Sequence, residues 1–472
     1  MACRRLTAVS SSKHNPNKRL RFCGVGVVGS DVSDGGGAMS GYRLKRNRCR
    51  SMVVCDGTHL ADIMRVIAVC GEVGFFAVRL FGIQGSGNAA LYGTTRERML
   101  EECEYKTPDG RVLFKGKAFS LRGKGQEKTI RVTSGGQSLF KEFEWGKEYL
   151  DKFSGGSLPT DRERVLRTVA LSEWCIFLHR SGIEYNPKIT PELYNLSLPI
   201  NGPHGKGERS PHKIETSVFY PSKEIKRKNE GRKLYGRGSR AHGFLVRKDR
   251  VEICYRLPKT RMVWQEREEG AITTFATSKF GPLNFGIRNS FEHPNALCLV
   301  DDYDKCEQVV FETPYTKRAN RDYSKPKERT LFKDMFSNVY VFPKNEGGVK
   351  SFIFHNIPDV EESLFEFYIA EESYRKEVYK SGYDCDAYDY DKGVATLFFF
   401  DGNITKLHRC ASARKRHTDE GVNLNTKIRV FCFPWQKTYL EKVFEGTTGV
   451  DIRVQNYEKI VDIMKKISEE RR

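Results

Sequence analysis

The stretch VATLFFF at residues 394–400 is the first of three strand-like segments that decide the fold of the C-terminal part of the chain. The other two are IRVFCF at 428–433 and VDIRV at 450–454. Helical patterns lie between and after them, at Ile404–Arg416, Trp435–Phe444 and Tyr457–Ile467. This alternation of strands and helices is typical of a parallel sheet with helices packed on it. The sequence therefore predicts an α/β domain, which we place at residues 236–472.

Further strand-like runs precede this alternation. Gly243–Arg247 and Val251–Leu257 are joined by Lys248-Asp249-Arg250, which indicates a hairpin. Other apolar runs are Ala296–Val300, Val339–Phe342 and Ser351–Phe354, which we interpret as strands. The whole chain is then expected to be mixed α+β, with a sheet that is only partly parallel.

The region at residues 57–150 has a different pattern, of three helices and a hairpin. The first helix is indicated by apolar residues at helical spacing, which are Leu60, Ile63, Met64, Ile67 and Ala68. A short second helix contains Phe76, Val78, Leu80 and Phe81 and ends at Gly82. A third helix follows Gly85-Ser86-Gly87-Asn88, where Ser86 or Asn88 can cap its first turn.

Two strand-like runs follow the third helix, at Arg111–Phe114 and Ala118–Leu121, with Lys115-Gly116-Lys117 between them. We expect them to pair as a hairpin, which completes the element order of a winged helix-turn-helix. On the third helix we expect an inward face of Leu91, Tyr92, Thr95, Met99 and Cys103, and an outward face of Thr94, Arg96, Glu97 and Arg98.

A winged helix-turn-helix with cations on its third helix and hairpin predicts contact with double-stranded DNA. Arginine reaches guanine edges or phosphates in the major groove, and lysines at a hairpin tip suit phosphate contact. The expected DNA-binding residues are Thr94, Arg96, Arg98, Lys115, Lys117, Arg122 and Lys124. The alternative interpretation is a winged helix that binds another protein.

The composition agrees with a polyanionic partner. The chain has 472 residues, a formal net charge of +20 and a pI of about 9.3. No run of about 18 apolar residues would span a bilayer, so no membrane partner is expected. Thirteen cysteines without a CxxC pair favour reduced thiols, and the N-terminus lacks a signal-peptide pattern, so a cytoplasmic location is expected.

The remaining segments are interpreted as connections. Residues 1–56 form an expected flexible basic arm, and residues 151–235 an expected helical linker and basic loop. Within the linker, Asp161–Ser181 predicts a helix whose apolar face is buried either against this chain or against a second copy in a homodimer.

Catalytic and cofactor motifs are weak. Residues 24–29 match GxGxxG, but no helical pattern follows, and neither a P-loop nor HxxR nor a His-hydrophobe-His pair occurs. We therefore predict no cofactor, no metal ligand and no catalytic residue.

The alternative is a metal-dependent nuclease that uses Asp301, Asp302 and Asp401. A nuclease hairpin at Asp249 and Glu252 is disfavoured, because Cys254 stands where the lysine is required.

Several short stretches carry a family resemblance. They are SRAHGFL at 239–245, VEICY at 251–255, MVW at 262–264, LFFFDG at 397–402 and VFCFPWQ at 430–436. In these the chain resembles uncharacterised proteins of plasmids and conjugative elements of Gram-positive bacteria, related loosely to the replication-relaxation family. The resemblance implies a winged helix followed by a nuclease-like α/β domain. It also implies a DNA-binding accessory role in plasmid replication, mobilisation or transcriptional control.

Overall fold

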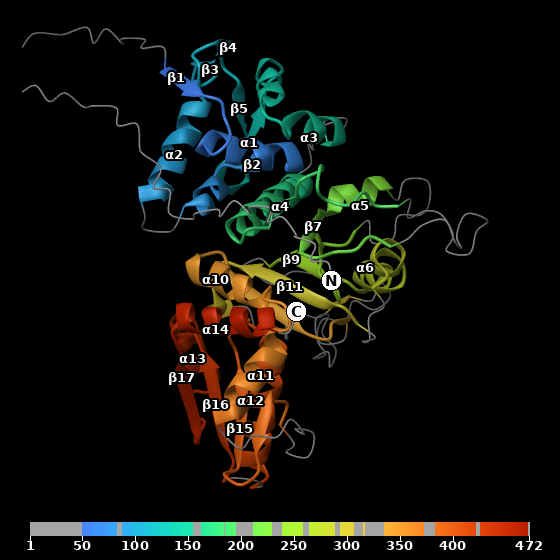
Figure 1. Cartoon of the computed structure of the whole chain (residues 1–472), viewed down its shortest axis with the longest axis vertical. Helices are drawn as coiled ribbons and strands as arrows, with labels where there is room; N and C mark the ends of the chain where they lie inside the picture. Colours follow the sequence, from blue (N-terminus) through green and yellow to red (C-terminus); the bar gives the residue numbers. More distant parts are fainter. Residues whose placement is uncertain are drawn as a thin grey trace, which may run out of the picture. The chain divides into compact units, whose positions relative to one another are not determined.

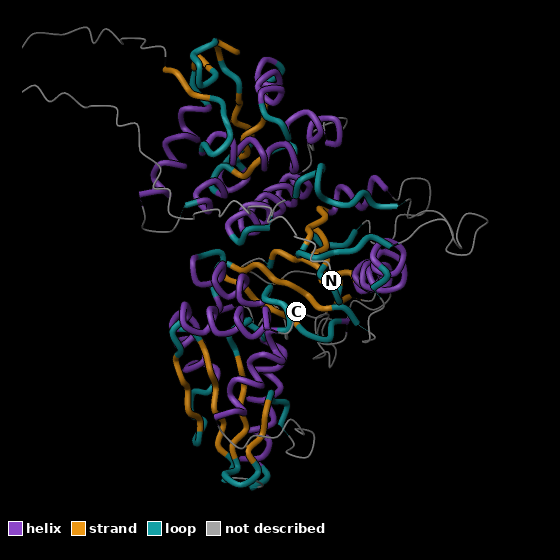
Figure 2. The backbone as a smooth tube through the Cα atoms, viewed as in Figure 1, coloured by secondary structure: helices purple, strands orange, loops and turns teal. Residues whose placement is uncertain are grey.

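The structure is a computed structural model, and it describes twelve segments of the chain. They are residues 50–82, 87–153, 162–183, 185–194, 211–228, 238–257, 264–287, 293–305, 315–316, 335–371, 383–421 and 425–470. Most of the expected basic arm, the GxGxxG match, Ser86 and much of the expected basic loop lie outside these residues. Figure 1 labels the elements along the chain, and Figure 2 colours them by type.

The three expected N-terminal helices are present. They are α1 (His59–Cys70), the short 3-10 helix η1 (Ala77–Phe81) and α2 (Gly87–Met99). α1 begins where it does because the Thr58 hydroxyl accepts a hydrogen bond from the backbone N–H of Ala61 at 3.2 Å. It ends at Gly71, whose φ of 84° is readily reached only without a side chain. Asn88 lies inside α2 rather than before it.

The strands that follow belong to two small sheets. One sheet has the order β1-β3-β4, from Arg50–Val53, Cys103–Lys106 and Val112–Gly116. The other has the order β2-β6-β5, from Val73–Gly74, Thr129–Val132 and Phe119–Arg122.

The expected pairing of Arg111–Phe114 with Ala118–Leu121 is wrong. β4 pairs with β3, whereas β5 pairs with β6, both antiparallel. Lys115 and Gly116 are the last residues of β4 and Lys117 begins the connection to β5, so residues 115–117 are not the tip of a hairpin. The hairpin connection lies instead at residues 123–128. The prediction failed because strand-like character does not identify the partner strand, and β3 and β6 were not predicted.

The expected linker helix is α4 (Arg162–Arg180), which packs inside its own chain. Trp174 is fully buried, and its ring is 6.5 Å from that of Phe352, centroid to centroid. Two further elements precede α4, namely the 3-10 helix η3 (Gly135–Glu142) and α3 (Gly146–Phe153). The partner of the apolar face of α4 is thus this chain itself.

A five-stranded sheet with the order β13-β11-β9-β8-β7 follows along the chain. Its strands are β7 (Val218–Pro221), β8 (Gly243–Val246), β9 (Val251–Arg256), β11 (Asn295–Val300) and β13 (Val339–Pro343). β9, β11 and β13 are parallel, and β8 pairs antiparallel with both β7 and β9. The predicted β8–β9 hairpin is therefore confirmed. Helices α5 (Ser222–Lys228), α6 (Glu266–Phe275) and α7 (Gly281–Phe285) lie between these strands in the sequence.

The interpretation of Ser351–Phe354 as a strand is wrong, because these residues lie in α10 (Glu346–His355). The Asn345 side chain caps α10 by accepting a hydrogen bond from the backbone N–H of Gly348 at 2.9 Å. Phe352 and Phe354 are both buried, so the short apolar run reflects a helix covered on two sides rather than a strand.

The predicted alternation at the C-terminus is confirmed. The strands β14 (Ala387–Asp389), β15 (Val394–Phe398), β16 (Lys427–Cys432) and β17 (Val450–Val454) lie in this order, and the last three are parallel (Figure 1). Helices α12 (Ile404–Asp419), α13 (Lys437–Val443) and α14 (Tyr457–Glu470) follow the parallel strands, and α11 (Val360–Glu371) precedes the sheet. The fold is mixed α+β with partly parallel sheets, as expected.

Both larger sheets are buried on two faces. On β15, Ala395 and Leu397 face one apolar core and Phe398 belongs to another, which also contains residues of α11 and α14. Such strands have nearly continuous apolar sequences, which explains why VATLFFF lacks alternation. None of the helices in the described part of the chain has the length and apolar character that a membrane crossing requires.

Candidate nucleic-acid interface

Helix α2 contains three of the expected DNA-binding residues, and they differ in their exposure to solvent. Thr94 and Arg98 are exposed, as predicted. Arg96 is only 3% exposed, so its expected outward orientation is wrong. Leu91, expected to face inward, is 46% exposed. The buried face of α2 therefore differs from the one that the sequence predicted, because Arg96 is buried and Leu91 is exposed.

Arg96 is buried, and its guanidinium group contacts two residues of this chain, Phe75 and Glu97, while its Nε has no hydrogen-bond partner. Its Cζ atom lies 3.8 Å from the centroid of the Phe75 ring, which allows a cation–π interaction. Nη1 donates to the carbonyl oxygen of Phe75 at 3.0 Å, and Nη2 donates to Glu97 Oε1 at 2.5 Å. Arg96 therefore holds α2 against the segment after β2 and is not available to DNA.

The two expected DNA-binding cations of the β5–β6 hairpin, Arg122 and Lys124, have different surroundings. Arg122 Nη1 lies 3.1 Å from Oε1 of Glu72, a carboxylate that is fully buried. The other carboxylate oxygen accepts a hydrogen bond from Thr129 Oγ1 at 2.6 Å. Arg122 is thus the counter-ion of a buried acid. Lys124, in the connection between the strands, is exposed.

Lys115 and Lys117 are exposed, but neither is at the hairpin tip, because Lys115 lies on β4 opposite Glu104 of β3 and Lys117 directly follows β4. Two cations that were not predicted lie on the elements of the proposed DNA-binding region. Arg79 is exposed on η1, and Lys128 precedes β6. The Lys128 Nζ atom is 5.8 Å from the centroid of the same Phe75 ring that Arg96 covers. Phe75 therefore connects the hairpin with α2, a contact that local sequence patterns did not indicate.

The acids expected for a nuclease do not converge on one site. Asp301, at the end of β11, lies 2.7 Å from Arg256 Nη2 and 2.6 Å from Lys344 Nζ. Glu173 of α4 contacts the same two cations, at 2.6 and 2.7 Å. Burial opposes ionisation of Asp301, but Arg256 and Lys344 still lower its pKa. These four side chains form a closed ion-pair network at the carboxyl edge of the first large sheet.

Asp302 is exposed, and Asp401 lies at the end of β15 in the other large sheet. Asp401 Oδ1 accepts a hydrogen bond from the backbone N–H of Asn403 at 3.0 Å. Burial raises the pKa of Asp401 to about 7, although Lys406 acts in the opposite direction. Lys406 itself is bound to Asp386 at 2.5 Å.

Glu252 is fully buried on β9, among cations of the β8–β9 hairpin. Its carboxylate lies 3.2 Å from Arg250 Nε and 3.7 Å from Arg247 Nη1, and His355 Nε2 is 3.2 Å away. Burial opposes ionisation, but these neighbours hold the pKa of Glu252 well below its usual range. Burial lowers the pKa of His355 to about 4, so this imidazole is neutral near pH 7. Glu252 is therefore held as a buried carboxylate among Arg247, Arg250 and His355.

Among the described residues, no three or more His, Cys, Asp or Glu side chains form a group that could hold a metal ion. The exposed cations on α2 and on the β5–β6 hairpin connection are Arg98 and Lys124. Comparison with known proteins adds no further constraint, because no family model, no curated protein and no solved structure matches the chain.

Proposed function

We propose that this chain binds double-stranded DNA through α2 and the β5–β6 hairpin. The observation that carries the proposal is that both elements have exposed cations, Arg98 on the helix and Lys124 on the hairpin connection, and that Phe75 contacts both α2 and the hairpin. The helix order α1, η1, α2 and the sheet order β2-β6-β5 are compatible with a winged helix-turn-helix. In such a unit the third helix enters the major groove and the hairpin contacts phosphates.

The proposed contact set differs from the one expected from sequence. It retains Thr94, Arg98 and Lys124 and adds Arg79 and Lys128. It omits Arg96 and Arg122, because both are held by partners within the chain. Neutralisation of phosphates by the remaining cations would release counter-ions, so the affinity should fall as salt rises.

The test is a fluorescence-anisotropy titration of a labelled duplex with the full chain at several salt concentrations. The logarithm of the association constant should fall linearly with the logarithm of the salt concentration. The double variant Arg98→Ala/Lys124→Ala should bind more weakly and show a shallower slope.

A matched control removes two equally charged residues from the C-terminal sheet region. Arg409 on α12 and Lys437 on α13 both have side chains that are 51% exposed. Arg409→Ala/Lys437→Ala should retain the wild-type affinity and slope. Equal losses in the two double variants would mean that net charge alone drives binding, and the proposed interface would be wrong.

The cellular role rests on the family resemblance alone. We propose that DNA binding serves replication, mobilisation or transcriptional control of a plasmid or conjugative element. Cleavage is not included, because Asp301 is engaged by two cations and Asp401 lies in a different sheet.

A further inference from the structure

Two cysteine thiols meet between helices of the N-terminal region. Cys70 is the last residue of α1, and Cys175 lies in the middle of α4. Their Sγ atoms are 3.7 Å apart, which is van der Waals contact. A disulfide requires a separation of about 2.05 Å, so a small approach of the two side chains would allow a bond.

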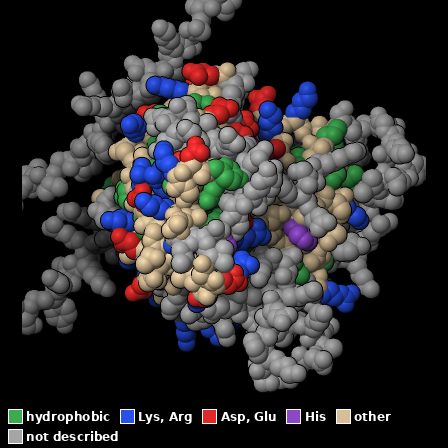
Figure 3. Space-filling view, turned by 90° about the horizontal axis from the view of Figure 1, so that it is seen from below, with side chains coloured by type: hydrophobic (Ala, Val, Ile, Leu, Met, Phe, Trp, Pro, Cys, Tyr) green, Lys and Arg blue, Asp and Glu red, His purple; other side chains and the backbone are tan. Residues whose placement is uncertain are grey.

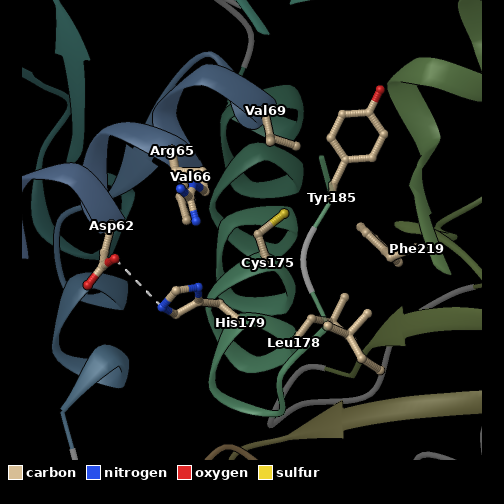
Figure 4. Close-up of a pocket in the computed structure, with 10 residues that line it drawn as sticks. Asp62, Arg65, Val66, Val69, Cys175, Leu178, His179, Tyr185 and Phe219 are labelled. Atoms are coloured by element: carbon tan, nitrogen blue, oxygen red, sulfur yellow. Dashed lines mark ion pairs between the residues drawn. The ribbon is translucent and has the colours of Figure 1, made fainter. Parts of the chain in front are cut away.

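Cys175 also borders a small cavity. Its other lining residues include Val69, Leu178 and Tyr185, and Figure 4 shows Cys175 between them. The cavity has a volume of about 30 Å³, which is the space of roughly one water molecule. Cys70, in contrast, is 1% exposed. A reagent as small as hydrogen peroxide would therefore reach Cys175 first.

The groups around Cys175 come from several elements. Helix α1 contributes Cys70, Asp62 and Arg65, and α4 contributes His179. The other groups are Tyr185, Lys223 on α5 and Cys254 on β9. The Lys223 ammonium donates a hydrogen bond to the carbonyl oxygen of Cys70. The hydrogen bond with Cys70, followed by burial, raises the pKa of Cys175 well above its usual value, so little of this thiol is ionised near pH 7 and oxidation should be slow there and accelerate as the pH rises.

We propose that Cys70 and Cys175 form an oxidative modification site that closes to a disulfide. The Cys175 thiolate attacks one oxygen of hydrogen peroxide, the O–O bond breaks and hydroxide leaves, which gives a sulfenic acid. The Cys70 thiol then attacks this sulfur, the S–O bond breaks and water carries away the Cys70 proton. Two thiols are oxidised to one disulfide, and one peroxide is reduced to two waters.

The bond would join α1 to α4 across a sequence separation of 105 residues. The segment between them contains η1, α2 and the β5–β6 hairpin. Closing such a long loop restricts the unfolded chain more than the folded one. The oxidised protein should therefore melt at a higher temperature than the reduced protein.

The experiment exposes the full chain to hydrogen peroxide at pH 7 and pH 8. Remaining thiols are then blocked with N-ethylmaleimide, and peptides are mapped by mass spectrometry with and without dithiothreitol. A dithiothreitol-sensitive peptide that links Cys70 to Cys175 is expected, and its rate of formation should rise about tenfold per pH unit. The melting temperature should rise on oxidation and return on reduction.

Cys70→Ser should remove both the linked peptide and the melting shift, whereas Cys432→Ser, at another buried cysteine, should leave both intact. The wild-type mapping does not depend on how well either variant folds. Absence of the linked peptide in the oxidised wild-type chain, or Cys175 recovered only as sulfinic acid, would overturn the proposal.

Discussion

The candidate interface and the large sheets use ionisable side chains in opposite ways. On the interface, Arg98 and Lys124 are exposed to solvent. In the sheets, Glu252 is buried among cations, and Asp301 lies within 2.7 Å of both Arg256 and Lys344. On the face shown in Figure 3, Lys and Arg side chains also lie among Asp and Glu side chains. A net charge of +20 therefore indicates a binding surface only where the cations are not already neutralised by neighbouring acids.

The largest expected effect is at the buried acid of the first large sheet. Glu252→Ala would leave Arg247 and Arg250 without their carboxylate, at a cost of about 3–5 kcal/mol in the free energy of unfolding. Urea denaturation measures this cost. Asp249→Ala, at a side chain that is 65% exposed, should change stability little. A small effect of Glu252→Ala would show that these sheet charges are not structural.

A pH effect is expected from Asp401, whose pKa burial raises to about 7. The folded state then binds a proton more tightly than the unfolded state, where the pKa is about 3.9. The contribution of the protonated Asp401 side chain to the free energy of unfolding is complete below about pH 4. This contribution, of up to about 4 kcal/mol, is lost as the pH rises to about 7. Asp401→Asn should abolish this part of the pH dependence in urea denaturation. Parallel curves for wild type and variant would contradict the assignment.

Arg96 and Arg98 provide a test of the interface within one helix. Arg96→Ala should lower the free energy of unfolding by about 2 kcal/mol, because it removes hydrogen bonds and the contact with Phe75. Arg98→Ala should leave stability nearly unchanged, because the side chain is exposed. If both variants were equally stable, the buried position of Arg96 would be in doubt.

Arg98→Ala should instead weaken duplex binding, by about 1 kcal/mol or roughly fivefold. Its exposed position on the proposed recognition helix is the reason for this expectation. An anisotropy titration at fixed salt measures the change. Wild-type affinity in this variant would remove α2 from the proposed contact surface.

The smallest effect is expected from Lys124→Ala, on the hairpin connection. Loss of one phosphate contact should reduce the salt slope of the association constant by about 1. Lys115→Ala provides the comparison, because Lys115 lies outside the hairpin. A larger change for Lys115 than for Lys124 would indicate that DNA contacts the β1-β3-β4 sheet instead of the hairpin.

Much of the fold could be predicted from local patterns. α1, α12 and the parallel strands β15, β16 and β17 all match the predicted segments closely, because each carries a long periodic or apolar signal. The short run at Ser351–Phe354 was wrong, since four apolar or small residues do not distinguish a buried helix from a strand. Whether the N-terminal elements form a winged helix, and where the domains divide, stay predictions.

Less of the candidate site could be predicted. Thr94, Arg98 and Lys124 are exposed as expected, whereas Arg96 and Arg122 are held by Phe75 and Glu72. Nothing near Arg96 in the sequence indicates burial, because its carbonyl partner is 21 residues away. The partner of Arg122 is 50 residues away, beyond the reach of any local pattern.

Composition and local patterns were enough to predict that the chain is basic, that its C-terminal part alternates strands and helices, and that a helix begins near Leu60. These properties depend on composition and on neighbours within a few residues. Local patterns did not show which cations face solvent, which strands pair, or that Cys70 contacts Cys175, because these features depend on residues far apart in the sequence. The reason is physical, because the charge of an arginine is set by its chemistry, whereas its availability to DNA depends on groups that only folding brings within hydrogen-bond distance.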